Sequence, residues 1–257
     1  MSKNIQFIAF RTIAAGEVRR IQRIWAQTII PPMITMMLYF IIFGGLIGQR
    51  VGMMAGRPYM AFIVPGLIMM TIIQNAYTNT SSSFFGSKFG RSVEELLVAP
   101  VENYTIILGY IVGGIYRGFI SGVVVLLVSM YFTKLTVHHV GVMLMSAFLT
   151  SVLFSIAGLI NAIFAKKFDD VALIPTFVLT PLTYLGGVFY SIDLLKGVWY
   201  KIALFNPIVY VVETFRYGML GTEGYHVYVS LFIIFIFTLL LFFFCLYLLR
   251  TGIGLRS

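Results

Sequence analysis

The strongest constraint on this chain is a long apolar run, from Phe232 to Leu249, that contains no charged residue. A stretch of this length and composition is typical of a helix that crosses a lipid bilayer. The remainder of the 257 residues agrees, since 60% of the chain is hydrophobic and only 11% is charged. A soluble domain carries about 25% charged residues, so we expect lipid to surround most of this protein.

Five further apolar segments precede this run. Together they predict an all-α polytopic membrane protein with six transmembrane helices, organised as a single domain over residues 1–257. The predicted spans are residues 27–48, 59–85, 104–131, 140–165, 171–190 and 227–249. Each approaches the length needed to cross about 30 Å of hydrocarbon at about 1.5 Å per residue. Because the fifth contains Pro175 and Pro181, we expect it to be bent.

Residues 3–25 also have a helical pattern, but apolar and basic side chains recur on different sides of that helix. This pattern predicts an N-terminal amphipathic helix that lies in the headgroup plane instead of crossing the membrane. The alternative is a basic N-terminal segment that only sets the topology.

The segment between the fifth and sixth spans, residues 191–226, is longer than the other loops and half apolar. It contains two helical pieces, Leu194–Phe205 and a second that runs from Asn206 to Leu220. Asn as N-cap, Pro in the first turn and Gly just past the end are the expected helix signals. Each piece is too short to cross a bilayer, which predicts a re-entrant hairpin.

The 18 Lys and Arg residues are unevenly distributed among the loops. With the N-terminus inside, eleven of them lie in cytoplasmic segments and six outside, while Arg117 falls within a span. By the positive-inside rule, this distribution favours both termini in the cytoplasm. Because the basic residues lie between apolar spans, they fit topology signals better than they fit a nucleic-acid-binding face, which would need a soluble fold.

The second span carries a stripe of polar side chains at helical spacing: Asn75, Thr78, Asn79 and Ser82. Such groups are costly in lipid, so the stripe is expected to face protein or water. One interpretation is the lining of a substrate path. The other is hydrogen bonding between helices, worth about 0.6 kcal/mol per contact. The sequence leaves both open.

The loop after the second span, residues 86–103, contains Ser92 and Glu95 at capping-box spacing. It predicts a short helix over Val93–Val98 that is ended by Pro100. This helix combines two carboxylates with a Leu-Leu-Val surface, which fits a knob that docks into a partner's groove. The alternative is an interfacial helix packed on lipid headgroups.

Arg117 lies near the middle of the third span, where an unpaired charge costs about 2.5–3.5 kcal/mol. The glycines beside it would allow another helix to approach and supply a partner. Asp169, Asp170 and Glu213 are the candidates, although Glu213 can also pair with Arg216 three residues further on. We favour structural pairing for these charges.

Catalytic motifs are scarce. No G-x-x-x-x-G-K-[ST] sequence occurs, so this chain does not bind ATP through a P-loop, and no H-E-x-x-H zinc motif occurs. Adjacent Asp169 and Asp170 would point about 100° apart on a helix, which is poor geometry for a catalytic dyad. The single Cys245 excludes a Cys-based zinc site. We therefore expect neither an enzyme nor a metal site.

Two segments carry a family resemblance. EELLVAPV after the second span and NPIVYVVETFRYGMLG before the last span resemble the ABC-2 type transporter permeases. The resemblance implies a bacterial inner (plasma) membrane protein that pairs with a second copy of itself among membrane lipids. It also implies two separate cytoplasmic ATPase subunits that hold ATP and Mg, with no cofactor and no nucleic acid bound by this chain.

The resemblance further implies roles for individual residues. The coupling helix, seated on the ATPase, would comprise Glu94, Glu95, Leu96, Leu97, Val98, Ala99 and Pro100. The extracellular gate helices would include Asn206, Pro207, Tyr210, Glu213, Phe215 and Arg216. The N-terminal helix would also touch the ATPase.

The resulting hypothesis is export of an amphiphilic, lipid, glycan or drug-like substrate. ATP-driven movement of the coupling helix would tilt the second and third spans, and substrate would leave past Tyr184, Phe189 and the gate helices. The first alternative is an ion-gradient-driven secondary transporter or channel, and the second is a membrane scaffold. Many secondary transporters have broken helices in matching halves, whereas here the breaks cluster in the fifth span and its hairpin.

Overall fold

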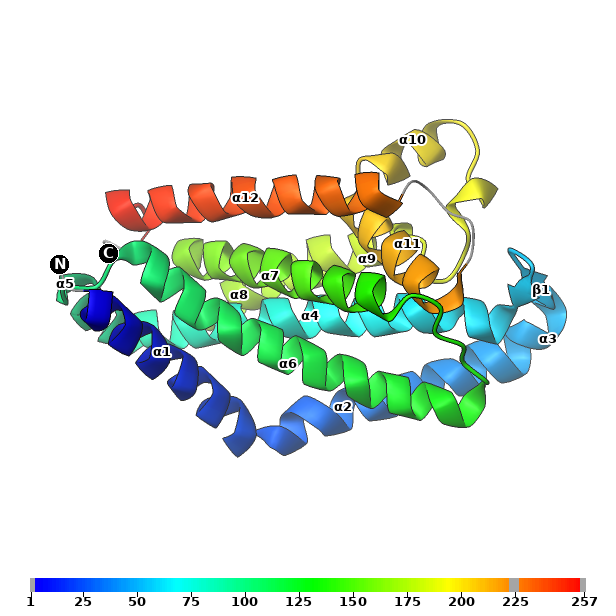
Figure 1. The fold of residues 1–257 in the computed structure, drawn as a ribbon, viewed down its shortest axis with the longest axis horizontal. Helices are drawn as coiled ribbons and strands as arrows, with labels where there is room; N and C mark the ends of the chain where they lie inside the picture. The colour runs from blue at the N-terminus through cyan, green and yellow to red at the C-terminus, as the bar shows by residue number, and fades with distance from the viewer. Residues whose placement is uncertain (1–2, 222–226, 255–257) are drawn as a thin grey trace.

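The structure, a computed structural model, describes residues 3–221 and 227–254 and is almost entirely helical. Among these residues, six helices are long and apolar enough to cross a membrane, as predicted. They extend over Trp25–Ile47, Tyr59–Phe89, Asn103–Phe132, Val140–Phe164, Phe168–Leu185 and Val227–Thr251. The bundle is elongated, and the first turns of α1 (Lys3–Arg23) lie at the same end as the last turns of α12 (Val227–Thr251) (Figure 1). We call this the terminal end, and the opposite one the far end.

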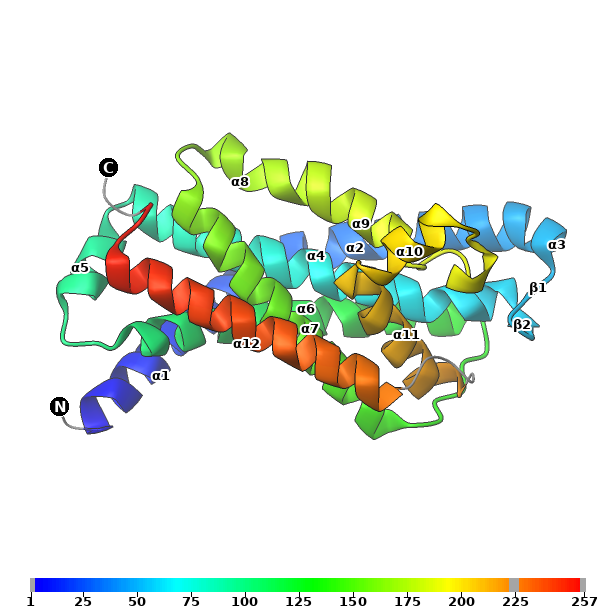
Figure 2. The ribbon, with the colours of Figure 1, turned by 90° about the horizontal axis from the view of Figure 1, so that it is seen from above.

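The second span, α4 (Tyr59–Phe89), forms the centre of the bundle (Figure 2). It packs against α6 (Asn103–Phe132), α7 (Val140–Phe164) and α11 (Pro207–Leu220), and 83% of its most apolar stretch is buried. The first and fifth spans lie at the outside of the bundle, with only 11% of the corresponding stretch buried in each. The helix with the polar stripe is therefore surrounded by protein, whereas the two outer spans present large apolar surfaces.

Close packing in the bundle depends on the small residues of α6. A Cβ atom on Gly113 would lie 2.6 Å from a carboxylate oxygen of Glu17, and one on Gly114 would lie 1.9 Å from the hydroxyl oxygen of Ser155. Neither position has room for a side chain, so the backbone of α6 comes directly against α1 and α7. This confirms that the glycines of the third span admit neighbouring helices.

The first and fifth spans depart from regular α-helix. The first consists of α2 (Trp25–Tyr39), the wider π-helical turn η1 (Phe40–Ile47) and α3 (Gly48–Val51). The fifth consists of α8 (Phe168–Ile174), the π-helical turn η2 (Pro175–Leu179) and α9 (Thr180–Leu185). Pro175 has no N–H to offer the carbonyl of Val171, and the side chain of Asn161 on α7 donates to that carbonyl at 3.0 Å. The irregularity expected from the prolines is thus present, and a side chain on α7 satisfies the carbonyl that Pro175 leaves free.

A short β-hairpin at the far end joins the first and second spans. Its strands, β1 (Met53–Met54) and β2 (Arg57–Pro58), pair antiparallel around Ala55 and Gly56, whose φ angles are 48° and 73°. Two successive positive φ values are typical of the tight type I′ turn. The sequence had suggested only a loop here.

The segment between the fifth and sixth spans contains η3 (Ile192–Leu194), α10 (Val198–Leu204) and α11. The predicted signals of α11 are confirmed: the Asn206 side chain accepts a hydrogen bond from the N–H of Ile208 at 3.0 Å, and Gly221 ends the helix with φ of 66°. Residues 222–226 of the predicted hairpin lie outside the described residues. That the two helices are re-entrant stays a prediction.

The N-terminal helix differs in extent from the prediction. α1 ends at Arg23, the chain turns at Ile24, and Trp25 already belongs to the first span. Of its apolar residues, Ile21 is buried whereas Ile8 is exposed. Part of α1 is therefore held by the bundle, and its position in the headgroup plane stays a prediction.

Candidate functional site

The short helix at the terminal end, α5 (Ser92–Val98), forms where the sequence predicted it. Its N-cap was predicted incorrectly. Arg91 occupies the cap position in the left-handed conformation, with φ of 59°, and no side chain caps the helix. Ser92 instead donates to the carbonyl of Ser87 at 3.1 Å, so the capping box with Glu95 does not form. Sequence spacing alone could not reveal that the tight turn after α4 engages Ser92.

The predicted coupling residues differ in exposure. Val93 is buried and Leu96 is half-buried against the apolar cluster of the terminal end. Val98 is 88% exposed, and the side chain of Leu97 lies outside the described part. The other predicted residues are exposed or half-exposed: Glu94, Glu95, Ala99 and Pro100. Among the side chains of α5 that the structure describes, Val98 is thus the exposed apolar one, while Leu96 anchors the helix.

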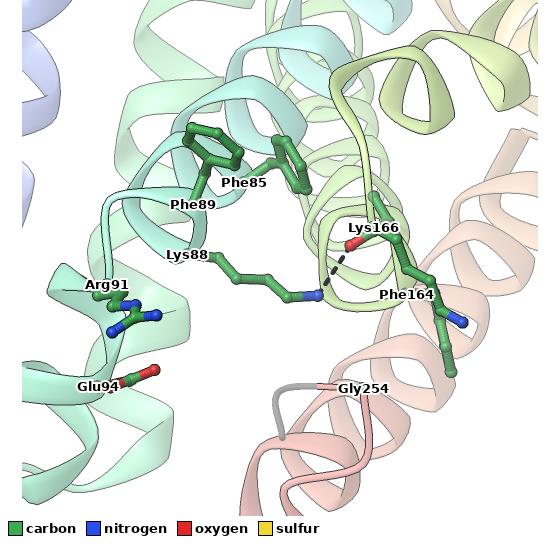
Figure 3. Close-up of a pocket in the computed structure, with 9 residues that line it drawn as sticks. Phe85, Lys88, Phe89, Arg91, Glu94, Phe164, Lys166 and Gly254 are labelled. Atoms are coloured by element: carbon green, nitrogen blue, oxygen red, sulfur yellow. Dashed lines mark hydrogen bonds between the residues drawn. The ribbon is translucent and has the colours of Figure 1, made fainter. Parts of the chain in front are cut away.

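A pocket of about 610 Å³ lies beside α5 (Figure 3). Arg91 and Glu94 form one wall, and Lys88 extends from α4 across the pocket. The ammonium of Lys88 donates to the carbonyls of Ile163 at 2.6 Å and Ala165 at 2.9 Å. These bonds satisfy the carbonyls at the end of α7, so Lys88 ties α4 to α7 beside α5.

The start of α1 is tied to the loop that follows α5. The side-chain carbonyl of Gln6 accepts from the backbone N–H of Glu102 at 3.0 Å and from the hydroxyl of Thr105 at 2.9 Å. Its amide donates to the carbonyl of Pro100 at 3.4 Å. One side chain of α1 therefore holds both the end of the α5 loop and the first turn of α6.

The middle of α1 is tied to α4 by a buried ionic network. Glu17 is 6% exposed; it accepts a hydrogen bond from Ser83 and pairs with Arg20 at 3.0 Å. Arg20 also donates to the side-chain oxygen of Asn79 at 2.9 Å. Asn79 is fully buried in this contact, so this member of the polar stripe bonds between helices. Sequence reasoning missed Glu17, although it is the only acidic residue before Glu94.

The remaining stripe residues face a different environment. Asn75 and Ser82 are half-buried, and Thr78 is exposed. Asn75 and Thr78 border a pocket of about 240 Å³ between α2, α4 and α6, into which Arg117 also extends. The stripe is therefore divided: the Asn79 side serves helix packing, whereas the Asn75–Thr78 side lines a polar pocket.

Arg117 does not receive the acidic partner that we expected. Asp170 accepts from the backbone N–H groups of Lys166 at 2.8 Å and Lys167 at 3.0 Å, and Glu213 pairs with Arg216. Asp169 is exposed beside Asp170. Among the described residues no carboxylate forms an ion pair with Arg117, and its Nε is buried without a hydrogen-bond partner. An unpaired charge within a span costs about 2.5–3.5 kcal/mol, which marks the site for function.

The predicted gate residues hold α11 to its neighbours. Arg216 is 1% exposed, pairs with Glu213 as predicted, donates to the carbonyl of Gly187 at 2.7 Å and stacks 4.0 Å above the Phe62 ring. The amide of Asn206 donates to the carbonyl of Leu182 at 2.6 Å.

The other gate residues add to this packing. Tyr210 donates to the carbonyl of Leu204 at 2.8 Å, which links α11 to α10. Phe215 is buried in the main core, and Pro207 occupies the first position of α11. These side chains fix α11 between α4 and the end of the fifth span, so any movement of this helix would have to break buried polar contacts.

An aromatic cluster joins the first and fifth spans nearer the far end. Phe189 stacks on Phe43 with ring centroids 4.9 Å apart and also contacts Tyr39 and Tyr184. The hydroxyl groups of Tyr39 and Tyr184 are 3.4 Å apart. Tyr184 and Phe189, predicted to border the exit, thus form part of one contact between the two outer spans.

The sequence profile of the ABC-2 type transporter family matches residues 8–220, which include α5, the divided stripe and all of α11. This chain belongs to the ABC-2 type transporter family.

Relatives of this ABC-2 protein agree with the assignment. The inner membrane transport permease YadH of Escherichia coli K12 is 52% identical over 254 residues, covering 99% of both chains, and the Shigella flexneri protein of that name matches equally. Nodulation protein J of Sinorhizobium fredii is 24% identical over 179 residues, covering 69% of this chain and 68% of the relative. The ABC-2 protein is therefore a multi-pass inner-membrane protein of the transport-permease type.

Proposed function

We propose that this ABC-2 permease is the transmembrane subunit of an exporter driven by ATP that a separate subunit hydrolyses. In this proposal two copies of the permease assemble with two cytoplasmic ATPase subunits, which hold ATP and Mg, and the terminal end faces the cytoplasm. The substrate is an amphiphile, a class that includes lipid, glycan and drug-like molecules.

The observation that carries the proposal is the tip of α5. Val98 is 88% exposed, next to the exposed carboxylates of Glu94 and Glu95, on a helix that Leu96 and Val93 anchor to the bundle. An exposed apolar side chain on an anchored helix fits a knob that inserts into a groove of a partner. Phe89, which is 67% exposed, is a second exposed apolar side chain at the terminal end; it lines the pocket at Lys88 and contacts Phe85 and Phe168.

The contacts of α1 support transmission of movement from this knob to the bundle. Gln6 holds the loop that follows α5, and further along the same helix Glu17 and Arg20 hold α4 at Ser83 and Asn79. A displacement of α5 would therefore act on the central helix α4 by two routes. One is the turn that joins α5 to α4, and the other is α1, which contacts both α4 and the loop that follows α5.

The surface of the outer spans supports pairing with a second copy. The first and fifth spans have only 11% of their apolar stretches buried, and both flank α4 (Figure 2). The polar pocket opens between the first span and α4, and the aromatic cluster of Tyr39, Phe43, Tyr184 and Phe189 bridges the outer spans beyond it. If two copies met along these spans, the polar pocket and the aromatic cluster would both lie on one path for the substrate at the seam between the copies.

The test is a charge at the docking tip. We expect Val98→Asp to lower stimulation of a co-expressed ABC ATPase by about tenfold or more, because a carboxylate would have to be desolvated in an apolar groove. Val98→Ala should have a smaller effect. Val137→Asp is the matched control. It places a charge on a valine that is 40% exposed in the loop between the third and fourth spans, and it should leave ATPase stimulation unchanged.

The readouts are ATPase rate in proteoliposomes and co-purification of the tagged ATPase. Wild-type stimulation in the Val98→Asp variant would contradict the docking role. Substrate transport by the purified permease under an ion gradient without nucleotide would instead support the secondary-transporter alternative.

A further inference from the structure

Arg117 presents a positive charge to a pocket that contains no acidic residue. The pocket of about 240 Å³ is lined by α2, α4 and α6: Gln27, Pro31, Pro32, Thr35, Met36, Thr71, Gln74, Asn75, Thr78 and Arg117. The Nε of Arg117 is buried without a hydrogen-bond partner, as are those of Arg20 and Arg216, but those two arginines have a carboxylate partner and Arg117 has none among the described residues. A guanidinium stays charged inside proteins, so the site retains an unsatisfied donor and an unneutralised positive charge.

The acidic side chain of α1 does not neutralise this charge. Glu17 lies against Gly113, four residues before Arg117 on α6, but its carboxylate is engaged by Arg20, Ser83 and Asn79. The polar side chains that line the pocket with Arg117 are amides and hydroxyls; the Thr71 hydroxyl donates to the carbonyl of Leu67 at 2.9 Å, and the Asn75 amide, which carries two N–H groups, donates to the carbonyl of Thr71 at 3.0 Å. A guanidinium with neighbouring neutral donors is the arrangement that recognises phosphate or carboxylate.

The apolar surface beside the pocket indicates what kind of anion fits. Along the same first span, Ile34, Leu38 and Ile41 are exposed by 51%, 53% and 56%. These side chains lie within a segment that is apolar enough to cross the membrane. A ligand with an acyl chain could therefore lie along the first span while its head enters the polar pocket.

We propose that Arg117, with the amides of Gln27, Gln74 and Asn75, binds the anionic headgroup of an amphiphile at this intramembrane pocket. The pocket supplies one charge-assisted contact and several neutral donors, so a single phosphate or carboxylate group is the matching head. Identification of this ligand as transported cargo rests on the proposed function; the binding site itself does not.

The experiment measures lipid binding to the purified full-length permease by native mass spectrometry. The probes are dioleoyl phosphatidylglycerol, which is anionic, and dioleoyl phosphatidylcholine, whose headgroup carries no net charge. We expect Arg117→Gln to weaken phosphatidylglycerol binding by about tenfold or more and to leave phosphatidylcholine binding unchanged. Arg117→Lys should retain part of the affinity. Arg23→Gln removes an exposed charge just before the first span and serves as the matched control.

A second pair of variants tests the pocket without removing Arg117. Thr78 is exposed in the pocket wall, so Thr78→Asp should supply an internal counter-ion and abolish the preference for phosphatidylglycerol. Thr78→Asn, of similar size and uncharged, should preserve it. Because Thr78 is at an exposed position, this pair gives an answer even where Arg117→Gln lowers expression.

Inorganic phosphate distinguishes the source of the anion. Competition by millimolar phosphate would show that the headgroup charge suffices for binding, and absence of competition would show that the apolar chain is required; both support the site. Equal phosphatidylglycerol affinity in wild-type, Arg117→Gln and Thr78→Asp proteins would overturn it. The assay contains neither ATPase nor nucleotide, so its outcome is independent of coupling through Val98.

Discussion

Arg216 and Arg117 both lie among the helices of the bundle, and each has a buried Nε without a hydrogen-bond partner, but the groups that surround the two charges differ. Arg216 is 1% exposed and has an acidic partner in Glu213, a carbonyl acceptor in Gly187 and the face of Phe62. Arg117 has a pocket, neutral polar neighbours and no carboxylate among the described residues. Burial beside a paired carboxylate indicates a role in holding helices together, whereas partial burial without a carboxylate partner indicates a role toward a ligand.

Arg20 is an intermediate case. Its side chain is 33% exposed, and its ion-pair partner Glu17 is 8% exposed. The pair joins α1 to α4 through Asn79, so it is structural like Arg216 but lies in a wetter position. The three arginines therefore form a series in which the stability lost on removing the charge should follow the degree of pairing and burial.

The largest effect is expected for Arg216→Met. The variant leaves Glu213 and the carbonyl of Gly187 without their donor in a largely buried site, which costs about 3–5 kcal/mol of unfolding free energy. Chemical unfolding of the purified protein in detergent measures the change. The double variant Glu213→Gln with Arg216→Met should recover part of it, since it removes the uncompensated charge. A loss below about 1 kcal/mol would break the comparison.

A smaller effect is expected for Glu17→Gln, which keeps the shape of the side chain but removes its charge. The bonds to Arg20 and Ser83 lose their ionic character, so we expect a loss of about 1–2 kcal/mol, reduced by solvent at Arg20. Hydrogen exchange should show faster opening of α1 than in wild-type protein. Gln22→Ala is the control, because Gln22 also lies on α1. It removes only a 3.4 Å contact to Tyr116 of α6 and should leave hydrogen exchange nearly unchanged.

The smallest loss of stability is expected for Arg117→Gln. No ion pair is lost and an unneutralised charge is removed from the span, so the unfolding free energy should stay the same or rise, by at most about 3 kcal/mol. The same detergent unfolding experiment provides the measurement. A loss as large as that of Arg216→Met would show that Arg117 is a structural charge, and it would remove the distinction between the two arginines.

Much of the architecture could be predicted from local patterns. The six spans follow from apolar length, and α11 follows from Asn206, Pro207 and Gly221, because these signals act within a few residues of the chain. The short helix after the second span was placed correctly for the same reason. Its cap was not, since Ser92 bonds to Ser87 in a turn whose conformation depends on Arg91.

The candidate site was less predictable because it depends on which side of a helix meets which neighbour. Helical spacing grouped Asn75 with Asn79, but α1 packs on only one of them. The Asn161 bond to Val171 could not be anticipated either, as it joins two helices to repair a carbonyl left free by Pro175. Spacing defines a face, and packing decides what that face contacts.

The amino-acid sequence by itself determined that this chain is a bundle of six membrane helices, with a short helix after the second span and a capped helix before the last span. These properties depend on transfer of apolar residues into lipid and on hydrogen bonds between residues close in the chain. Only the tertiary structure decided that Glu17 joins α1 to α4, that Arg216 is neutralised and that Arg117 is not. The pairing of charges is decided by distances between helices, and those distances come from the packing of the whole bundle.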